Sequence, residues 1–139
     1  MNQQTVLSHT DTVVIINAIY EQAIIDRATV AVAVVDAHGE LLGFVRTDGC
    51  RLSSIQIAQM KAYTSAREHI PSLDMGKRSR DAENGFPMTN FGELKYVTWG
   101  GGVPIVYDGE VVGAVGVSGM SEDEDIAYAE LGIQALLDR

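Results

Sequence analysis

The sequence has little cysteine and proline and no long apolar run. Cys50 is the only cysteine, so no disulfide can form within the chain, and a reducing cytoplasm is the expected compartment. No stretch approaches the roughly 20 apolar residues that a membrane-spanning helix needs. The first ten residues lack the basic and apolar regions of a secretion signal. We therefore expect a cytoplasmic protein without a membrane partner.

Basic residues are missing from residues 96–138, which carry eight acidic residues, whereas eight of the ten lysines and arginines lie in residues 46–95. The net charge is −9. Nucleic acid is not an expected partner, because phosphate binding needs a basic face. The segregation fits a pocket for a small anionic ligand built from the middle of the chain. It also fits a solvated acidic surface with ordinary ion pairs. The charge distribution by itself favours this second interpretation.

The chain is long enough for one domain, over residues 1–139, with a real core. Apolar periodicity predicts helices over residues 10–26, capped by Thr10 or Asp11, and over residues 52–69 and 123–137. The middle helix carries a stripe of mostly small side chains that permits close packing: Ile55, Ala58, Ala62 and Ala66. Residues 72–93 read as a long loop with a short helix near 73–80, and such loops are often functional.

Strands are predicted over residues 29–36, 40–46, 96–99 and 111–118, with a short apolar strand after Pro104. Turn sequences at 36–39 and at Asp108-Gly109 each join two neighbouring strands into a hairpin, and hairpins require antiparallel pairing. Alternation places Val115 and Val117 on one face of the last strand, and Val112, Gly116 and the other small residues on the opposite face. The sequence predicts an α+β fold with an antiparallel sheet of about five strands and helices packed on it.

Four ordered motifs carry a resemblance to a known family. They are AVVDAHGELLGFVRTDG (33–49), SIQIAQMKAYTSA (54–66), GGGVPIVYDGEVVGAVGVSG (100–119) and SEDED (121–125). In this order and spacing the chain resembles the GlcG/HbpS-like family, which includes heme-binding proteins and the C-terminal domain of PduO-type proteins. The resemblance implies a profilin-like sheet and a homo-oligomer. Some members bind heme, and others accompany catabolic enzymes, so the resemblance implies two alternative functions.

The first function is heme or tetrapyrrole binding, with heme as the implied cofactor. Iron in heme commonly takes a neutral histidine as axial ligand. His9 is the best candidate, because some heme-binding relatives use a residue near that end of the chain, and Thr98 lies where family members approach heme. His38 in a turn reads as an exposed residue, and His69 at a helix end reads as a favourable cation for the helix dipole.

The residues that follow Thr98 add to this candidate binding site. Trp99 and the backbone N–H groups of Gly100, Gly101 and Gly102 could contact an anion or a flat ring, although a sharp bend also explains three glycines. Asn90 and Trp99, together with the loop cations Arg78, Arg80 and Lys95, could close over a carboxylated substrate in a site made between subunits. Acidic residues 122–125 lie at the start of a predicted helix, where their negative charges interact favourably with the helix dipole. Because this explains the acidic run, no metal site is predicted.

The second function is a small cofactor-free hydrolase or isomerase, of the enamine or imine deaminase or tautomerase type. Its substrate would be a carboxylated intermediate of an aromatic ring-cleavage, diol or glycolate pathway. Lys61, Arg46 and Asp48 are the candidate catalytic residues. Lys61 is flanked by small residues, and a partly buried amine can hold a carboxylate, act as a base or form an imine. Equally, Lys61 and Asp48 could form an ion pair that fixes the helix to the hairpin.

Overall fold

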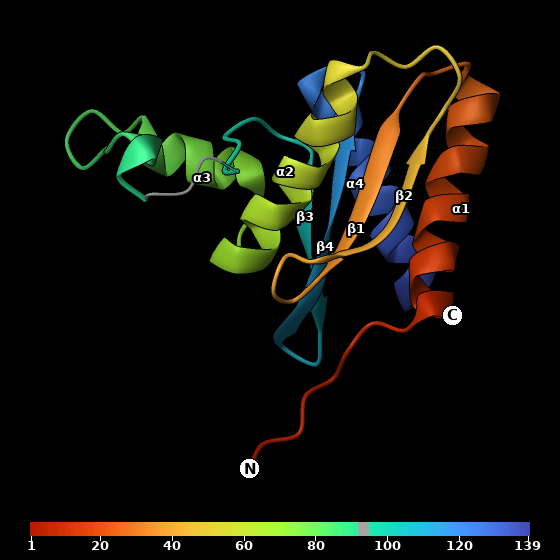
Figure 1. Cartoon of the computed structure of the whole chain (residues 1–139), viewed down its shortest axis with the longest axis horizontal. Coiled ribbons are helices and arrows are strands. Elements are labelled where there is room, and N and C mark those ends of the chain that lie inside the picture. Colours follow the sequence, from red (N-terminus) through yellow and green to blue (C-terminus); the bar gives the residue numbers. More distant parts are fainter. Residues whose placement is uncertain (92–94) are drawn as a thin grey trace.

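The computed structural model describes residues 1–91 and 95–139, which form an antiparallel sheet with helices on both faces (Figure 1). The strand order is β2-β1-β4-β3. Along the chain the elements are α1 (His9–Asp26), β1 (Ala31–Asp36), β2 (Leu41–Arg46), α2 (Ser53–Glu68), α3 (Ser72–Ser79), the 3₁₀ helix η1 (Met88–Phe91), β3 (Gly102–Tyr107), β4 (Glu110–Ser118) and α4 (Glu122–Leu137). The predicted α+β class with antiparallel pairing is confirmed.

The prediction of about five strands is wrong, because the described residues form four. The missing strand is the one expected over residues 96–99, where the backbone takes no sheet partner. Instead, the Val97 N–H donates to the Thr64 hydroxyl of α2 at 2.9 Å, and the Tyr96 hydroxyl donates to the Glu68 carboxylate at 2.6 Å. Helix side chains therefore satisfy this segment in place of a strand neighbour.

The helices follow the predicted pattern with one shifted start. Ser8, and not Thr10 or Asp11, caps α1: its hydroxyl accepts from the Asp11 N–H at 3.2 Å, and the Asp11 carboxylate accepts from the Ser8 N–H at 2.8 Å. Ser121 caps α4 by accepting from the Glu124 N–H, and the short helix expected near 73–80 is α3. None of the helices in residues 1–91 and 95–139 is both long and apolar enough to cross a bilayer.

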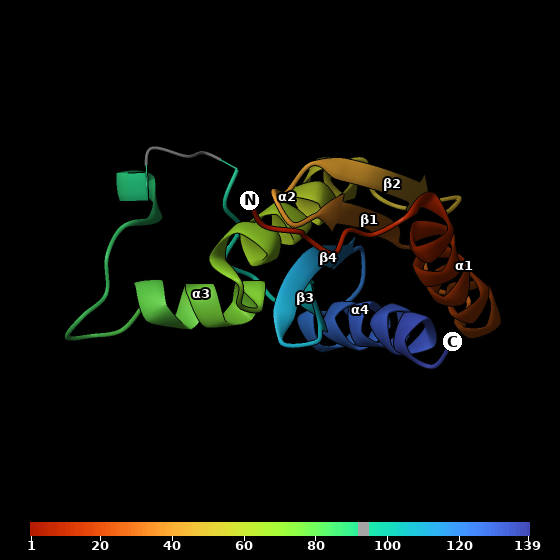
Figure 2. The ribbon, with the colours of Figure 1, turned by 90° about the horizontal axis from the view of Figure 1, so that it is seen from below.

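The two faces of the sheet differ in side-chain size, as the alternation predicted. Helices α1 and α4 cover the face with the larger residues, including Val32 and Val115, and α2 covers the face with the smaller ones, including Ala33 and Ala114 (Figure 2). Val112 is an exception, because it belongs to the larger cluster. The pairing of β3 with β4 skips Val112, and this bulge reverses the alternation before Gly113.

Helix α2 lies in backbone contact with β4 and β3. A Cβ atom on Gly116 would collide with the Ala58 carbonyl and approach the Ala62 nitrogen to 2.7 Å, and one on Gly102 would collide with the Lys61 carbonyl. Helix α2 packs mainly on β4, β1 and β3. The edge strand β2 therefore has little cover from α2 on this face.

Residues 72–91 extend away from the sheet as an arm (Figures 1 and 2). The arm begins with α3 and ends with η1, where the Phe86 and Phe91 rings are 5.4 Å apart. Phe91 also approaches Tyr96, with ring centroids 5.5 Å apart. The predicted loop is thus partly helical and has its own aromatic cluster; Glu93, its last predicted residue, lies outside the described residues.

Substituting Gly116 by alanine tests the contact between α2 and β4. We expect Gly116→Ala to lower the free energy of unfolding by about 1–3 kcal/mol, because the new methyl group meets α2 backbone that cannot rotate away. Gly132→Ala in α4 is the matched control, since the three atoms nearest to its new methyl group belong to the Ile15 and Ile19 side chains and not to backbone. Urea unfolding measures both. If Gly116→Ala lowers the free energy of unfolding by no more than Gly132→Ala does, the result would contradict this packing.

Candidate ligand-binding site

The backbone of the glycine segment 100–102 forms hydrogen bonds with side chains of the protein itself. The Gly100 N–H donates to the Glu122 carboxylate at 2.8 Å, and the Gly102 N–H donates to the Ser72 hydroxyl at 2.9 Å. Ser72 in turn donates to the carbonyl of Trp99 at 2.5 Å. Two of the three N–H groups that the sequence offered to a ligand are therefore bonded to the protein's own side chains.

Close packing explains why glycine occupies these positions. Gly101 has φ +125°, and a Cβ atom there would lie 2.7 Å from the Lys61 amine. At Gly100 a Cβ atom would lie 2.6 Å from the Ile126 side chain of α4. The segment is a bend against which α2 and α4 pack.

Lys61 is buried beside this bend, with 3% of its surface exposed. Its amine donates to the Val117 carbonyl at 2.8 Å and to the Asp125 carboxylate at 3.1 Å. The second oxygen of Asp125 accepts from the Met120 N–H at 3.0 Å. Burial raises the pKa of Asp125, and the positive charge of Lys61 opposes that rise. The pair joins α2, β4 and the start of α4.

The burial expected for Lys61 is confirmed, but the alternative in which Lys61 forms an ion pair with Asp48 is wrong. Arg46 and Asp48 are exposed at and after the end of β2. Within residues 1–91 and 95–139, the carboxylate partner of Lys61 is Asp125. The sequence could not rank Asp125 above Asp48, because 64 residues separate it from Lys61 and it lies in a run of four acids.

The other predicted ligand contacts lie apart from one another. His9 is exposed at the start of α1, on the sheet face opposite α2, and Asn90 is exposed on the arm. Trp99 is 57% exposed beside the glycine segment, and the half-buried Thr98 has its hydroxyl 3.5 Å from the Arg80 guanidinium. The structure does not bring these residues into one pocket with His9.

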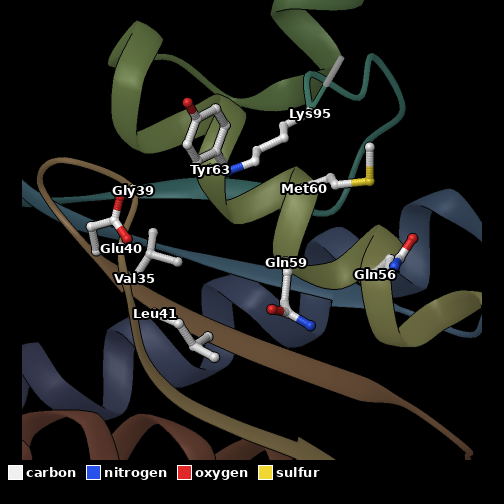
Figure 3. Close-up of a pocket in the computed structure, with 9 residues that line it drawn as sticks. All are labelled: Val35, Gly39, Glu40, Leu41, Gln56, Gln59, Met60, Tyr63 and Lys95. Carbon is white, nitrogen blue, oxygen red and sulfur yellow. The ribbon is translucent and has the colours of Figure 1, made fainter. Parts of the chain in front are cut away.

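A pocket of about 410 Å³ lies between α2 and the turn that joins β1 to β2, and we call it the α2–turn pocket (Figure 3). Its volume is within the range of about 300–1,000 Å³ that is common for small-molecule sites. Three parts of the chain line it: Val35, Gly39, Glu40 and Leu41 from the hairpin, Gln56, Gln59, Met60 and Tyr63 from α2, and Lys95.

The position of α2 explains the pocket. Because the small-residue stripe holds α2 over β4, β1 and β3, the neighbouring face of α2 looks toward β2. Residues 56, 59, 60 and 63 follow the spacing of one helical face. The alanine stripe predicted the packed face of α2, whereas this adjacent face carried no prediction although its spacing is visible in the sequence. Lys95 was predicted only as a loop cation.

Tyr63 is the aromatic wall of the α2–turn pocket. A Cβ atom on Gly39, which has φ +89°, would lie 2.7 Å from the Tyr63 ring, so the turn and the ring are in close contact. The Lys95 amine and the Arg67 guanidinium carbon each lie 5.1 Å from the ring centroid. Both distances are typical of cation–π interactions. The pocket therefore combines an aromatic wall with one cationic side chain, Lys95, and one carboxylate, Glu40.

Three comparisons with known proteins agree with this fold. The family model described as "Haem degrading protein HbpS-like" matches residues 7–134. The Protein GlcG of Escherichia coli K12 is 36% identical over 124 residues, with 85% of each chain covered. The chain belongs to the HbpS-like family.

Solved structures extend the comparison. A structure of the PduOC:heme complex has a TM-score of 0.88 and 28% identity, covering 94% of this chain and 95% of that one. A double mutant of HbpS from Streptomyces reticuli has a TM-score of 0.87 and 31% identity, covering 98% of this chain and 90% of that one. A relative of this chain has thus been solved with heme.

Removing the Lys61 charge tests the buried pair. We expect Lys61→Met to lower the free energy of unfolding by about 3–5 kcal/mol, because the Asp125 carboxylate stays buried without its cation. The double variant Lys61→Met/Asp125→Leu should recover most of that loss, since neither charge remains. Urea unfolding of the wild type, both single variants and the double variant gives the coupling free energy between Lys61 and Asp125. Additive losses in the double variant would contradict a direct pair.

Proposed function

We propose that this protein binds heme or a related tetrapyrrole in the α2–turn pocket. The observation that carries the proposal is a pocket with an apolar wall and an iron-donor side chain in a chain 28% identical to the heme-bound PduOC structure. Membership of the HbpS-like family supports the same ligand class.

The lining residues fit the chemistry of heme. The ring needs apolar contacts, which Val35, Leu41 and Tyr63 supply, and the iron needs a donor, for which the Met60 thioether is suited. His38 precedes the lining residue Gly39 in the same turn, and its side chain is 74% exposed, so it is a second candidate donor. Leu41 is 49% exposed, so a ring larger than the pocket has apolar surface to extend over. Bound heme would supply an iron centre for redox or small-ligand chemistry.

His9 defines a competing position for the same ligand. It lies in sequence between Leu7 and Asp11, which help to line a second pocket of about 580 Å³ on the α1 side of the sheet. Because α1 and α2 cover opposite faces, His9 of one chain and the α2–turn pocket are separate sites. Variants at the two places therefore distinguish them.

The enzymatic alternative receives less support. It depends on the amine of Lys61, which is buried and bonded to Val117 and Asp125. A substrate carbonyl or carboxylate would have to displace Asp125 from a site that is closed to solvent.

We also propose a homo-oligomer, for which exposed apolar residues of α1 offer surface: Tyr20, Ile24 and Ile25.

Hemin titration with a pocket-filling variant tests the proposal. The wild type should give a saturable Soret shift with one hemin per chain at micromolar concentration. Gln59→Trp should weaken binding by at least about tenfold, because the indole fills the pocket. Gln134→Trp, on the exposed face of α4, should bind like the wild type.

Two further variants identify the iron donor. Met60→Leu conserves volume and removes the sulfur, so a shifted Soret maximum would assign Met60, and His38→Ala tests the imidazole in the same way. Loss of binding in His9→Ala with normal binding in Gln59→Trp would place the site at α1 and contradict our assignment. Absence of a saturable shift in the wild type would reject heme binding.

A further inference from the structure

The carboxylate of Glu40 lines the α2–turn pocket and forms no hydrogen bond or ion pair within residues 1–91 and 95–139. The backbone of Glu40, by contrast, is fixed. Its N–H donates to the Asp36 carboxylate at 3.0 Å, and its carbonyl accepts from the Asp36 N–H at 2.9 Å. The turn therefore holds Glu40 in place and leaves its carboxylate available to a ligand.

The cations near the turn are already engaged. Arg67 donates to the His38 carbonyl at 3.5 Å, and both Arg67 and Lys95 lie 5.1 Å from the centroid of the Tyr63 ring. Both cations also have further contacts within the protein. The charged group that the pocket offers to a ligand is therefore a hydrogen-bond acceptor, the Glu40 carboxylate.

Two glutamine carboxamides on α2 add further acceptors. Gln59 donates to the Ile55 carbonyl at 3.0 Å, which leaves its carboxamide oxygen for another partner. The Gln56 carboxamide forms no hydrogen bond in the described part of the chain and offers both an acceptor and donors. Figure 3 shows Glu40 and Gln56 at opposite ends of the pocket, with Gln59 between them. The pocket thus presents acceptors along its length and an amide at one end.

These acceptors distinguish open-chain tetrapyrroles from closed rings. In heme all four ring nitrogens are bonded to iron, and in an iron-free porphyrin the N–H groups point into the ring. An open-chain tetrapyrrole exposes pyrrole and lactam N–H groups on its open side and carries a lactam carbonyl at each end. A carboxylate accepts from such N–H groups in charge-assisted hydrogen bonds, which are stronger than neutral ones.

We propose that the α2–turn pocket accepts open-chain tetrapyrroles, with the Glu40 carboxylate bound to their N–H groups and the Gln56 carboxamide bound to a lactam end. This assignment rests on the proposed function and names a ligand class for the same site. The apolar contacts of Val35 and Leu41 serve open and closed tetrapyrroles alike. Glu40 is therefore the residue that distinguishes the two classes.

Titrations with biliverdin, hemin and iron-free protoporphyrin, followed by absorbance, test the assignment. Biliverdin is the open-chain ligand, and all three carry two propionates, so repulsion by the net charge of −9 affects them alike. Glu40→Met removes the acceptor and keeps the backbone contacts with Asp36. It should raise the Kd for biliverdin about tenfold relative to the Kd values for hemin and protoporphyrin.

Two further variants complete the test. Gln56→Leu should change the ratio of Kd values in the same direction by a smaller factor, because a neutral hydrogen bond is lost. Glu130→Met removes an exposed acid from α4, on the other face of the sheet, and is the control for net charge. It should leave the ratio unchanged.

The outcomes separate this assignment from the proposed function. Saturable binding of hemin by the wild type without binding of biliverdin would overturn the assignment and leave heme binding intact. Equal weakening of all three ligands by Glu40→Met would also overturn it, because the variant would then act on the shape of the pocket. An unchanged Kd for biliverdin in Glu40→Met would remove Glu40 from recognition. Failure of all three ligands to saturate would reject tetrapyrrole binding and this assignment with it.

Discussion

The contact between the backbone of α2 and the small-residue face of the sheet determines the rest of the structure. Gly116 of β4 lies against Ala58 and Ala62, and Gly102 of β3 lies against the Lys61 carbonyl. Side chains of ordinary size would push the helix outward. Because α2 lies this deep, the Lys61 amine reaches the Val117 carbonyl and Asp125, so the start of α4, on the other face of the sheet, is joined to α2.

The α2–turn pocket is a consequence of the same contact. A helix held over β4, β1 and β3 cannot also cover β2, and the uncovered part of the hairpin becomes one wall of the pocket. Tyr63 and Met60 project from the adjacent face of α2 to form the opposite wall. The hairpin turn and Lys95 are distant in sequence, but both lie beside the Tyr63 ring of α2 and therefore line the same pocket.

Local patterns predicted most of the fold. Alternating small and large residues in β1 and β4 predicted the two faces, and the alanine stripe predicted close packing of α2. Two features depended on tertiary contacts that no local pattern encodes. Residues 96–99 were predicted as a strand, but the Val97 N–H bonds to the Thr64 hydroxyl, and Lys61 pairs with Asp125 from a distant acidic run. The pocket could have been found in part, from the spacing of residues 56, 59, 60 and 63.

A crystal structure of the protein with an iron-free metalloporphyrin, such as the gallium complex of protoporphyrin, tests the central claim most directly. Our account predicts ring density between α2 and the β1–β2 turn, against Tyr63 and Leu41. Ring density beside His9 on the α1 side of the sheet, with the α2–turn pocket empty, would contradict it.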